Sequence, residues 1–262
     1  MTARERVVVI GLAAAMALPA AASAQALSCS IPAQLPRPHP ELPSASEPQR
    51  LLPIGGYTLA LTWSPEYCHG AANRGGSATE CGGGNRFGFT LHGLWPDGVG
   101  KQWPQYCRAA PLLPEATLRA TMCATPSVQL QQHEWAKHGT CMAGFDPNSY
   151  FKRSTGLYAA LRFPDMNALS REQGLNVGRL AGAMAAANPG LPATAIRVTV
   201  NPRGWLNELW LCLDKRFAYV RCRADSGGAA ATTPVKVWRG GSGGFSRRAS
   251  RYRDNAYRHG GE

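Results

Sequence analysis

Large apolar residues occupy every second position between residues 57 and 63, which is the period of a β-strand with one buried face. Other short apolar runs lie near residue 90 and in the last third of the chain. Strands are therefore predicted over residues 57–63, 87–91, 196–200, 207–213 and 217–222, the last two as a hairpin around Asp214 and Lys215.

Polar capping residues predict where three helices begin. Thr125-Pro126-Ser127 precedes a helix running from residue 129 to about residue 138, and Asp146-Pro147 offers an N-cap and an N1 proline for a helix to Leu161. A third helix is predicted over residues 177–187, ending before Asn188-Pro189-Gly190. The mixed order of elements predicts an α+β fold in which a central antiparallel or mixed sheet is flanked by helices.

The chain is expected to have four parts. Residues 1–24 have a charged head, an apolar run too short for a membrane span and a small-residue exit, the pattern of a cleaved signal peptide, with Ala26 as the alternative cleavage position. Residues 25–54 contain six prolines from Pro32 to Pro48 and are predicted to be an extended leader without function. Residues 55–223 form the predicted catalytic domain. Residues 224–262 form a basic Gly/Ser/Arg-rich tail, interpreted as a solvated, dispensable extension, with an arm that tethers the protein to RNA or to a surface as the alternative.

Eight cysteines all follow the signal peptide, and an even number in an exported chain predicts four disulfides. No Cys-x-x-Cys pair occurs, so zinc-knuckle spacing is absent. The glycine-rich residues 70–85 are predicted to form a loop held down at Cys68 and Cys81, and they lack the Lys-Ser/Thr of a phosphate-binding P-loop. The chain is expected to be periplasmic or secreted, without a membrane span.

The formal net charge of +12 becomes +11 when the two arginines and one glutamate of the signal peptide are removed. Such a field favours polyanions, although a basic surface also serves solubility. Charge alone therefore does not decide the function.

Titratable and aromatic residues concentrate in two segments, HGLWPD at residues 92–97 and HEWAKHGTC at residues 133–141. The second segment lacks the histidine spacing of a zinc protease. His133 and His138 are five residues apart, which places them roughly 140° apart on a regular helix and predicts that they do not share a metal ion. Glu134 and His138 are four apart and share a face, with Lys137 beside them.

A carboxylate, an ammonium and two imidazoles are sufficient to cleave RNA without a metal. One group removes the proton from the 2′-hydroxyl, another protonates the departing 5′-oxygen, and a cation meets the charge on the phosphoryl oxygens. Histidine suits both proton transfers near neutral pH.

The two segments resemble the active-site segments of the ribonuclease T2 family, in the expected order and separation. The resemblance extends over roughly residues 57–222 and is strongest at the motifs. It implies an α+β, disulfide-stabilised endoribonuclease that cleaves single-stranded RNA with low base specificity, through a 2′,3′-cyclic phosphate. No metal or other cofactor is expected, and the protein is expected to be a monomer.

The resemblance also implies roles for individual residues. His92 and His138 would be the general acid and base, with His138 as the base of the first step. Glu134 and Lys137 would stabilise the phosphorane, and His133 would bind phosphate. Trp95 would stack on a base that Asp97 hydrogen-bonds. The implied disulfides are Cys107 to Cys141, Cys68 to Cys123, Cys212 to Cys222 and, by remainder, Cys29 to Cys81, one of 105 possible pairings of eight cysteines.

Simpler interpretations compete with these roles. Glu134 and Lys137 are also spaced for an ordinary surface ion pair worth about 0.2–0.5 kcal/mol, and Trp135 is predicted to be a core residue. A basic RNA-binding or cell-toxic secreted protein, acting without turnover, is the second function class. A metal hydrolase is the third, and the histidine spacing argues against it.

Overall fold

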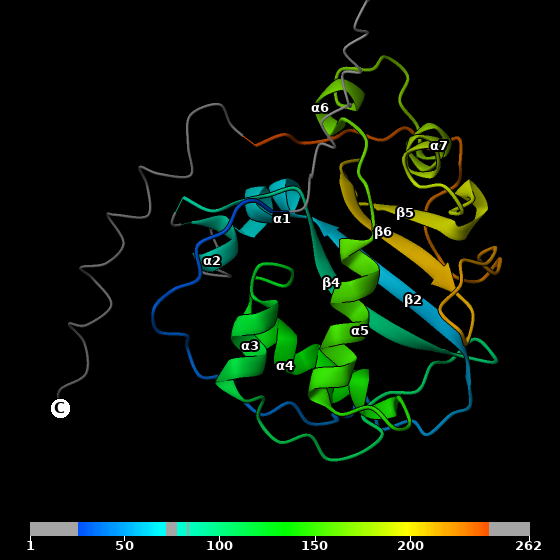
Figure 1. Cartoon of the computed structure of the whole chain (residues 1–262). Coiled ribbons are helices and arrows are strands. Elements are labelled where there is room, and N and C mark those ends of the chain that lie inside the picture. The colour runs from blue at the N-terminus through cyan, green and yellow to red at the C-terminus, as the bar shows by residue number, and fades with distance from the viewer. Residues whose placement is uncertain (1–25, 72–77, 83, 241–262) are drawn as a thin grey trace, which may run out of the picture.

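A four-stranded antiparallel sheet in the order β4-β2-β6-β5 forms the centre of the protein, with helices around it (Figure 1). The computed structural model describes residues 26–71, 78–82 and 84–240. The strands are β1 (Ala26–Ser28), β2 (Ile54–Trp63), β3 (Arg86–Phe87), β4 (Phe89–Gly98), β5 (Ile196–Val200) and β6 (Leu206–Leu213). The helices are α1 (Ser64–Ala71), α2 (Ala78–Cys81), α3 (Glu115–Thr121), α4 (Val128–Lys137), α5 (Pro147–Ala159), α6 (Met166–Leu169) and α7 (Val177–Ala187). The predicted α+β fold is confirmed.

The hydrophobic core lies between the sheet and the helices that cover it, chiefly α5 and α7. Leu59 of β2 and its partner Leu94 of β4 are both fully buried. Two tyrosines fix α5 across β4, because the Tyr150 hydroxyl donates to the Leu94 carbonyl at 3.1 Å and the Tyr158 hydroxyl donates to the Phe89 carbonyl at 2.7 Å. Leucines buried at this density supply the main driving force for folding. One face of the sheet is therefore buried in the core.

The capping residues begin the helices as the sequence predicts. The Ser127 hydroxyl accepts from the Leu130 amide at the start of α4, and Asp146 forms a capping box with Ser149 at the start of α5. The side chain of Asn176 caps α7, whose bounds match the prediction. The α4 helix ends at Lys137 rather than at His138, and this one-residue difference affects the site described below.

The predicted strand over residues 217–222 is wrong. The Asp214 side chain accepts from the amides of Arg216 and Ala218, which folds the chain into a turn, and Phe217 has a φ of 65°. A left-handed residue at this position interrupts an extended strand. An isolated bridge between Leu213 and Tyr219 and a hydrogen bond from the Val220 amide to the Cys212 carbonyl remain of the expected hairpin.

Two of the four predicted disulfides are wrong. Cys107–Cys141 and Cys212–Cys222 form as expected, but the other bridges are Cys29–Cys123 and Cys68–Cys81. The reason is the course of the leader, since β1 pairs with β3 and carries Cys29 toward the end of α3. The predicted loop over residues 70–85 is tied by Cys68–Cys81 and contains the short helix α2 within its described part.

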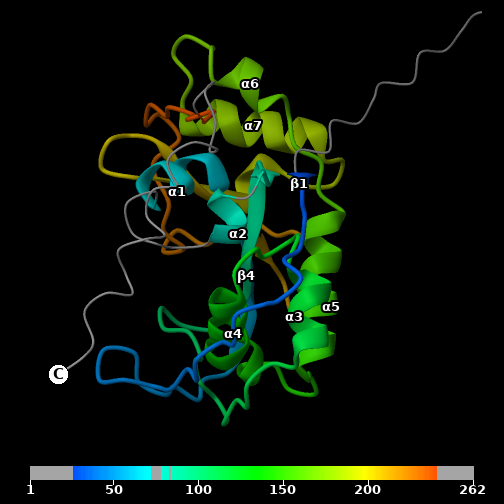
Figure 2. The same cartoon turned by 90° about the vertical axis from the view of Figure 1, so that its left-hand side faces the viewer.

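The leader is extended but is not a free linker. Figure 2 shows it running from β1 past α3 and α4. Arg119 donates to the carbonyl of Pro32, the His39 amide donates to the Gln129 side chain, and Arg50 pairs with Gln105 through their backbones. Proline-rich backbone cannot join a sheet on its own, but it packs here through side chains and single bridges.

The first part of the predicted tail also packs on the domain. The amide of Leu206 donates to the Lys236 carbonyl, and Val235 and Val237 are buried. The expectation of a solvated extension is therefore wrong for residues 224–240. The predicted signal peptide and the rest of the tail, from residue 241, lie outside the described residues. Among the helices that the structure describes, none is both long and apolar enough to cross a bilayer.

Candidate active site

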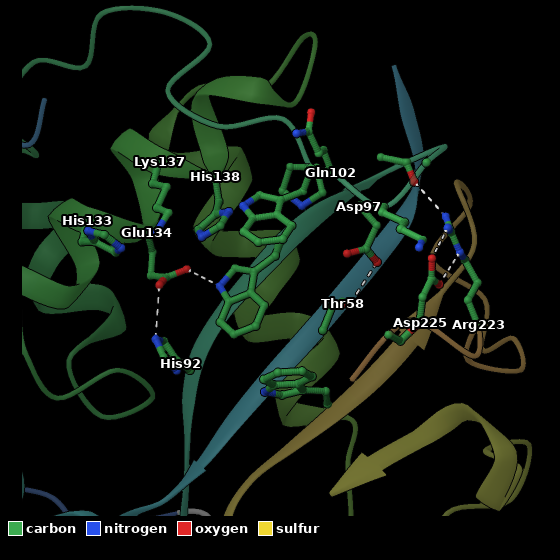
Figure 3. Close-up of a pocket in the computed structure, with 18 residues that line it drawn as sticks. Thr58, His92, Asp97, Gln102, His133, Glu134, Lys137, His138, Arg223 and Asp225 are labelled. Carbon is green, nitrogen blue, oxygen red and sulfur yellow. Dashed lines mark hydrogen bonds and ion pairs between the residues drawn. The ribbon is translucent and has the colours of Figure 1, made fainter. Parts of the chain in front are cut away.

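A cavity of about 430 Å³ opens between β4, the end of α4 and the free face of the sheet, and all seven site residues predicted from the two motifs line it (Figure 3). They come from two elements. The strand β4 supplies His92, Trp95 and Asp97, and the end of α4 supplies His133, Glu134, Lys137 and His138.

A β-bulge in β4 turns His92 into this cavity. Trp95 and Asp97 are two residues apart and share a face, whereas His92 is an odd number of residues from both and would face the core in a regular strand. Consecutive residues of β2 pair with Gly93 and Leu91, so His92 is an extra residue opposite β2. Bulges re-aim side chains in this way next to functional sites.

The end of α4 brings the second group of residues together. His138 follows the last helical residue and has φ −109° and ψ −51°, which departs from helical geometry. Its ring centroid lies 6.4 Å from that of His133. Ligand atoms of His133, Glu134 and His138 lie within 4.8 Å of one another. The prediction that the two histidines point apart is therefore wrong, because it assumed that the helix continues through His138.

Two of these three side chains already have partners that compete with a metal ion. The indole of Trp95 donates to Glu134 Oε2 at 2.8 Å, and Glu41 Oε2 lies 3.4 Å from His133 Nδ1. The cluster therefore fits proton transfer and phosphate binding better than the closed ligand set of a structural metal site.

Glu134 is a buried carboxyl at the centre of the site. Its Oε1 lies 3.5 Å from His92 Nε2, as the dashed line in Figure 3 marks. Burial raises the pKa of Glu134, and the charges of His92 and His133, the Trp95 hydrogen bond and Lys137 lower it; the net direction is upward. A Cβ on Gly93 would stand 1.8 Å from Glu134 Oε2, so this glycine leaves the room that the carboxyl occupies.

The two imidazoles have opposite electrostatic environments. Burial lowers the pKa of His138 well below its usual value, and the positive charges of Lys137, His133 and His92 lower it further. Burial also opposes protonation of His92, but a hydrogen bond that the imidazole donates to Glu208 and the charges of Glu134 and Glu208 raise the pKa of His92 overall. Two titratable groups whose pKa values are pushed apart are the usual signature of an acid and a base.

The aromatic residues of the motifs have different positions. Trp135 is buried against Tyr150, as predicted for a core residue. Trp95 lines the cavity, but its ring stacks on that of His138, with 5.5 Å between the ring centroids. Its indole nitrogen donates a hydrogen bond to Glu134. Trp95 therefore also holds the two catalytic candidates of α4 in place.

Asp97 lies at the far end of the cavity. Its Oδ2 accepts a hydrogen bond from Thr58 at 2.9 Å. Burial raises the pKa of Asp97, against the lowering effects of Thr58 and Arg223. A half-buried carboxyl that lines the cavity can recognise a base through hydrogen bonds.

The leader places two carboxylates at the site that the sequence does not predict. Glu47 forms an ion pair with Lys137, and Glu41 contacts His133. The hydrogen bond from Lys137 and its charge lower the pKa of Glu47, against the effect of burial. Both contacts join residues about ninety positions apart, so no local pattern indicates them.

Other lining residues were also missed. They line the cavity from strands and loops outside the two motifs: Thr58, Lys101, Gln102, Trp103, Trp210, Arg223 and Asp225. Thr58 and Trp210 lie on strands whose alternation is visible in the sequence, so the face they point to was predictable once the sheet order was known.

Comparisons with known proteins agree with this geometry. The model of the ribonuclease T2 family matches residues 54–222. A probable ribonuclease of Haemophilus influenzae is 33% identical over 184 residues, which cover 66% of this chain and 62% of that protein, so the match spans less than two thirds of that relative. A ribonuclease of Aeromonas hydrophila is 30% identical over 166 residues, covering 61% of this chain and 71% of that protein. The solved structure of trichomaglin, described as an S-like ribonuclease, shares the fold with a TM-score of 0.54 at 19% identity, covering 70% of this chain and 98% of that one. The chain belongs to the ribonuclease T2 family.

Proposed function

We propose that this protein is an endoribonuclease that cleaves single-stranded RNA, with low base specificity and without a metal, by transphosphorylation through a 2′,3′-cyclic phosphate. One observation carries the proposal: two imidazoles with oppositely shifted pKa values line one cavity together with a buried carboxyl and an ammonium. Family membership is consistent with it.

The reaction assigns each proton to one histidine. Neutral His138 takes the proton of the 2′-hydroxyl, and the 2′-oxygen attacks phosphorus. Protonated His92 gives its proton to the 5′-oxygen as the P–O5′ bond breaks. Lys137 and Glu134 stabilise the crowded phosphorane, and His133 binds a phosphoryl oxygen. Trp95 and Asp97 contact the base beside the scissile phosphate.

The experiment that tests this function compares RNA with DNA of the same sequence, both incubated with purified protein in EDTA. We expect cleavage of the RNA with cyclic-phosphate ends and no cleavage of the DNA, because DNA lacks the 2′-hydroxyl nucleophile. Loss of RNA cleavage in EDTA, or equal cleavage of DNA, would overturn the proposal.

We also propose that the protein is exported to the periplasm or secreted. The predicted signal peptide and the four disulfides support an oxidising compartment. Fractionation of cells that express the full chain tests this, since a protein retained in the cytoplasm with its first residues intact would contradict it.

The rate of RNA cleavage is expected to have a broad maximum with pH. Activity needs neutral His138, whose pKa is lowered, so the acid limb lies below the usual histidine pKa of about 6.5. Activity also needs protonated His92, whose pKa is raised, so the alkaline limb lies above that value. Measurement of kcat/KM from acid to mildly alkaline pH checks both limbs. A narrow peak in which the two limbs cross would contradict the assignment.

Removing the leader carboxylates is expected to strengthen RNA binding. In the Glu41→Gln, Glu47→Gln double variant, His133 and Lys137 no longer have to release a carboxylate before they meet a phosphate. Ion pairs near the surface are worth about 0.2–1 kcal/mol each, so KM should fall by at most about five-fold for each of the two pairs removed. The control is Glu115→Gln, which breaks a surface pair with Arg119 on α3. A rise in KM would indicate instead that the leader positions Lys137.

A further inference from the structure

A second carboxylate, Glu208, contacts the ring of His92 at Nδ1 and does not itself line the cavity. Its Oε1 lies 2.5 Å from His92 Nδ1. Glu208 belongs to β6, where it pairs in register with Thr62 of β2. The contact joins residues 116 positions apart, and neither sequence motif includes Glu208.

Three groups fix the carboxylate of Glu208. The Trp210 indole donates to Oε2 at 2.8 Å, and the Thr62 hydroxyl donates to Oε1 at 3.2 Å. His92 contacts Oε1 through its Nδ1. Burial alone would raise the pKa of Glu208, but its hydrogen bonds and the charge of His92 lower it overall. The carboxylate is therefore ionised and can only accept hydrogen bonds, so Nδ1 of His92 must donate.

This contact determines which atom of the imidazole is available to a substrate. With Nδ1 held by Glu208, Nε2 is turned toward Glu134, 3.5 Å away. The indole of Trp95 packs edge-on against the ring at 5.1 Å. The charged groups around His92 are Glu208 on β6, Glu134 on α4, Glu80 on α2 and the imidazole of His138. Of the carboxylates, only Glu208 is in hydrogen-bond contact with the ring.

We propose that Glu208 is a positioning residue for His92, which orients the imidazole and holds its positive charge so that Nε2 can deliver a proton to the leaving 5′-oxygen. The inference deepens the proposed function and rests on it. In the step itself the Nε2–H bond breaks, the proton passes to the 5′-oxygen as the P–O5′ bond breaks, and His92 remains neutral with its Nδ1 proton on the Glu208 side. A carboxylate behind a functional imidazole fixes the ring and its tautomer in other enzymes, and its loss behind metal-binding histidines typically costs about 10- to 100-fold.

The variant Glu208→Gln tests the proposal, because it keeps the size of the side chain and removes its charge. We expect the NMR titration of His92 to move to lower pH and the alkaline limb of kcat/KM to move with it. We expect kcat to fall about 10- to 100-fold with little change in KM, since Glu208 does not line the cavity. Glu208→Asp keeps the charge and should restore part of the His92 titration, and this second variant covers the case in which the glutamine variant does not fold.

The matched control is Glu66→Gln. Glu66 is another buried carboxylate beside a histidine, 3.4 Å from His69 Nδ1, and it does not line the cavity. Its replacement should leave the His92 titration and the pH profile unchanged. An unchanged titration of His92 and an unchanged kcat in Glu208→Gln would overturn the proposal. If the wild-type protein failed to cleave RNA, the proposed function would fail, but the NMR titration would still measure the pair of His92 and Glu208.

Discussion

Replacing His138 or His92 with alanine is expected to lower kcat/KM for RNA cleavage by about 10²- to 10⁴-fold each, the usual contribution of a general base or acid. Both imidazoles line the same cavity from separate elements, and their pKa values are shifted in opposite directions. Because the two groups act in one step, the double variant should lose little more than the worse single variant. Initial rates of cleavage of single-stranded RNA measure the loss in the two single variants and in the double variant.

The control for these variants is His39→Ala. The His39 side chain is exposed on the leader, and only its backbone groups bond to Gln129. This variant should keep the full rate. If the His92 and His138 variants kept the wild-type effect on RNA or on cells, the protein would act by binding, as the non-catalytic interpretation of its charge requires.

Replacing Gly93 with alanine is expected to abolish most activity although the new side chain is a single methyl group. Its Cβ would stand 1.8 Å from Glu134 Oε2 and 2.8 Å from Trp95 Nε1, so the carboxyl and the indole would both have to move. A displacement of about 1 Å at a reacting centre can cost about 10²-fold, and we expect a loss in kcat of at least that size. Thermal unfolding measured on the same sample shows whether the domain also loses stability.

Gly182→Ala is the matched control for this change. Gly182 lies within α7, and a Cβ built there meets nothing within 4 Å. Alanine is favoured over glycine inside a helix by about 0.5–1 kcal/mol, so this variant should unfold at a slightly higher temperature and retain its activity. Equal activity of the Gly93 and Gly182 variants would mean that Glu134 is not required where the structure places it.

The periodic signals of the sequence were sufficient for most elements. The two-residue period predicted β2, a short apolar run predicted β6, and the caps Ser127 and Asp146 predicted where α4 and α5 begin. These signals are local, because a strand face or a helix cap depends on residues within one or two turns of each other. The prediction of a hairpin after β6 failed because it used only such local signals. The apolar run of residues 217–222 does not indicate that Phe217 adopts a left-handed conformation.

The amino-acid sequence alone identified the seven motif residues that line the cavity, because each motif gathers them within a few positions of one strand or one helix. The tertiary structure decided how they meet. Their meeting depends on the bulge that turns His92, on the end of α4 that turns His138 toward His133, and on the contact of Glu208 of β6 with His92. It also decided the Cys29–Cys123 and Cys68–Cys81 pairing and the approach of the leader carboxylates. These features join segments far apart in the chain or depend on strand register, and local propensity carries no information about either.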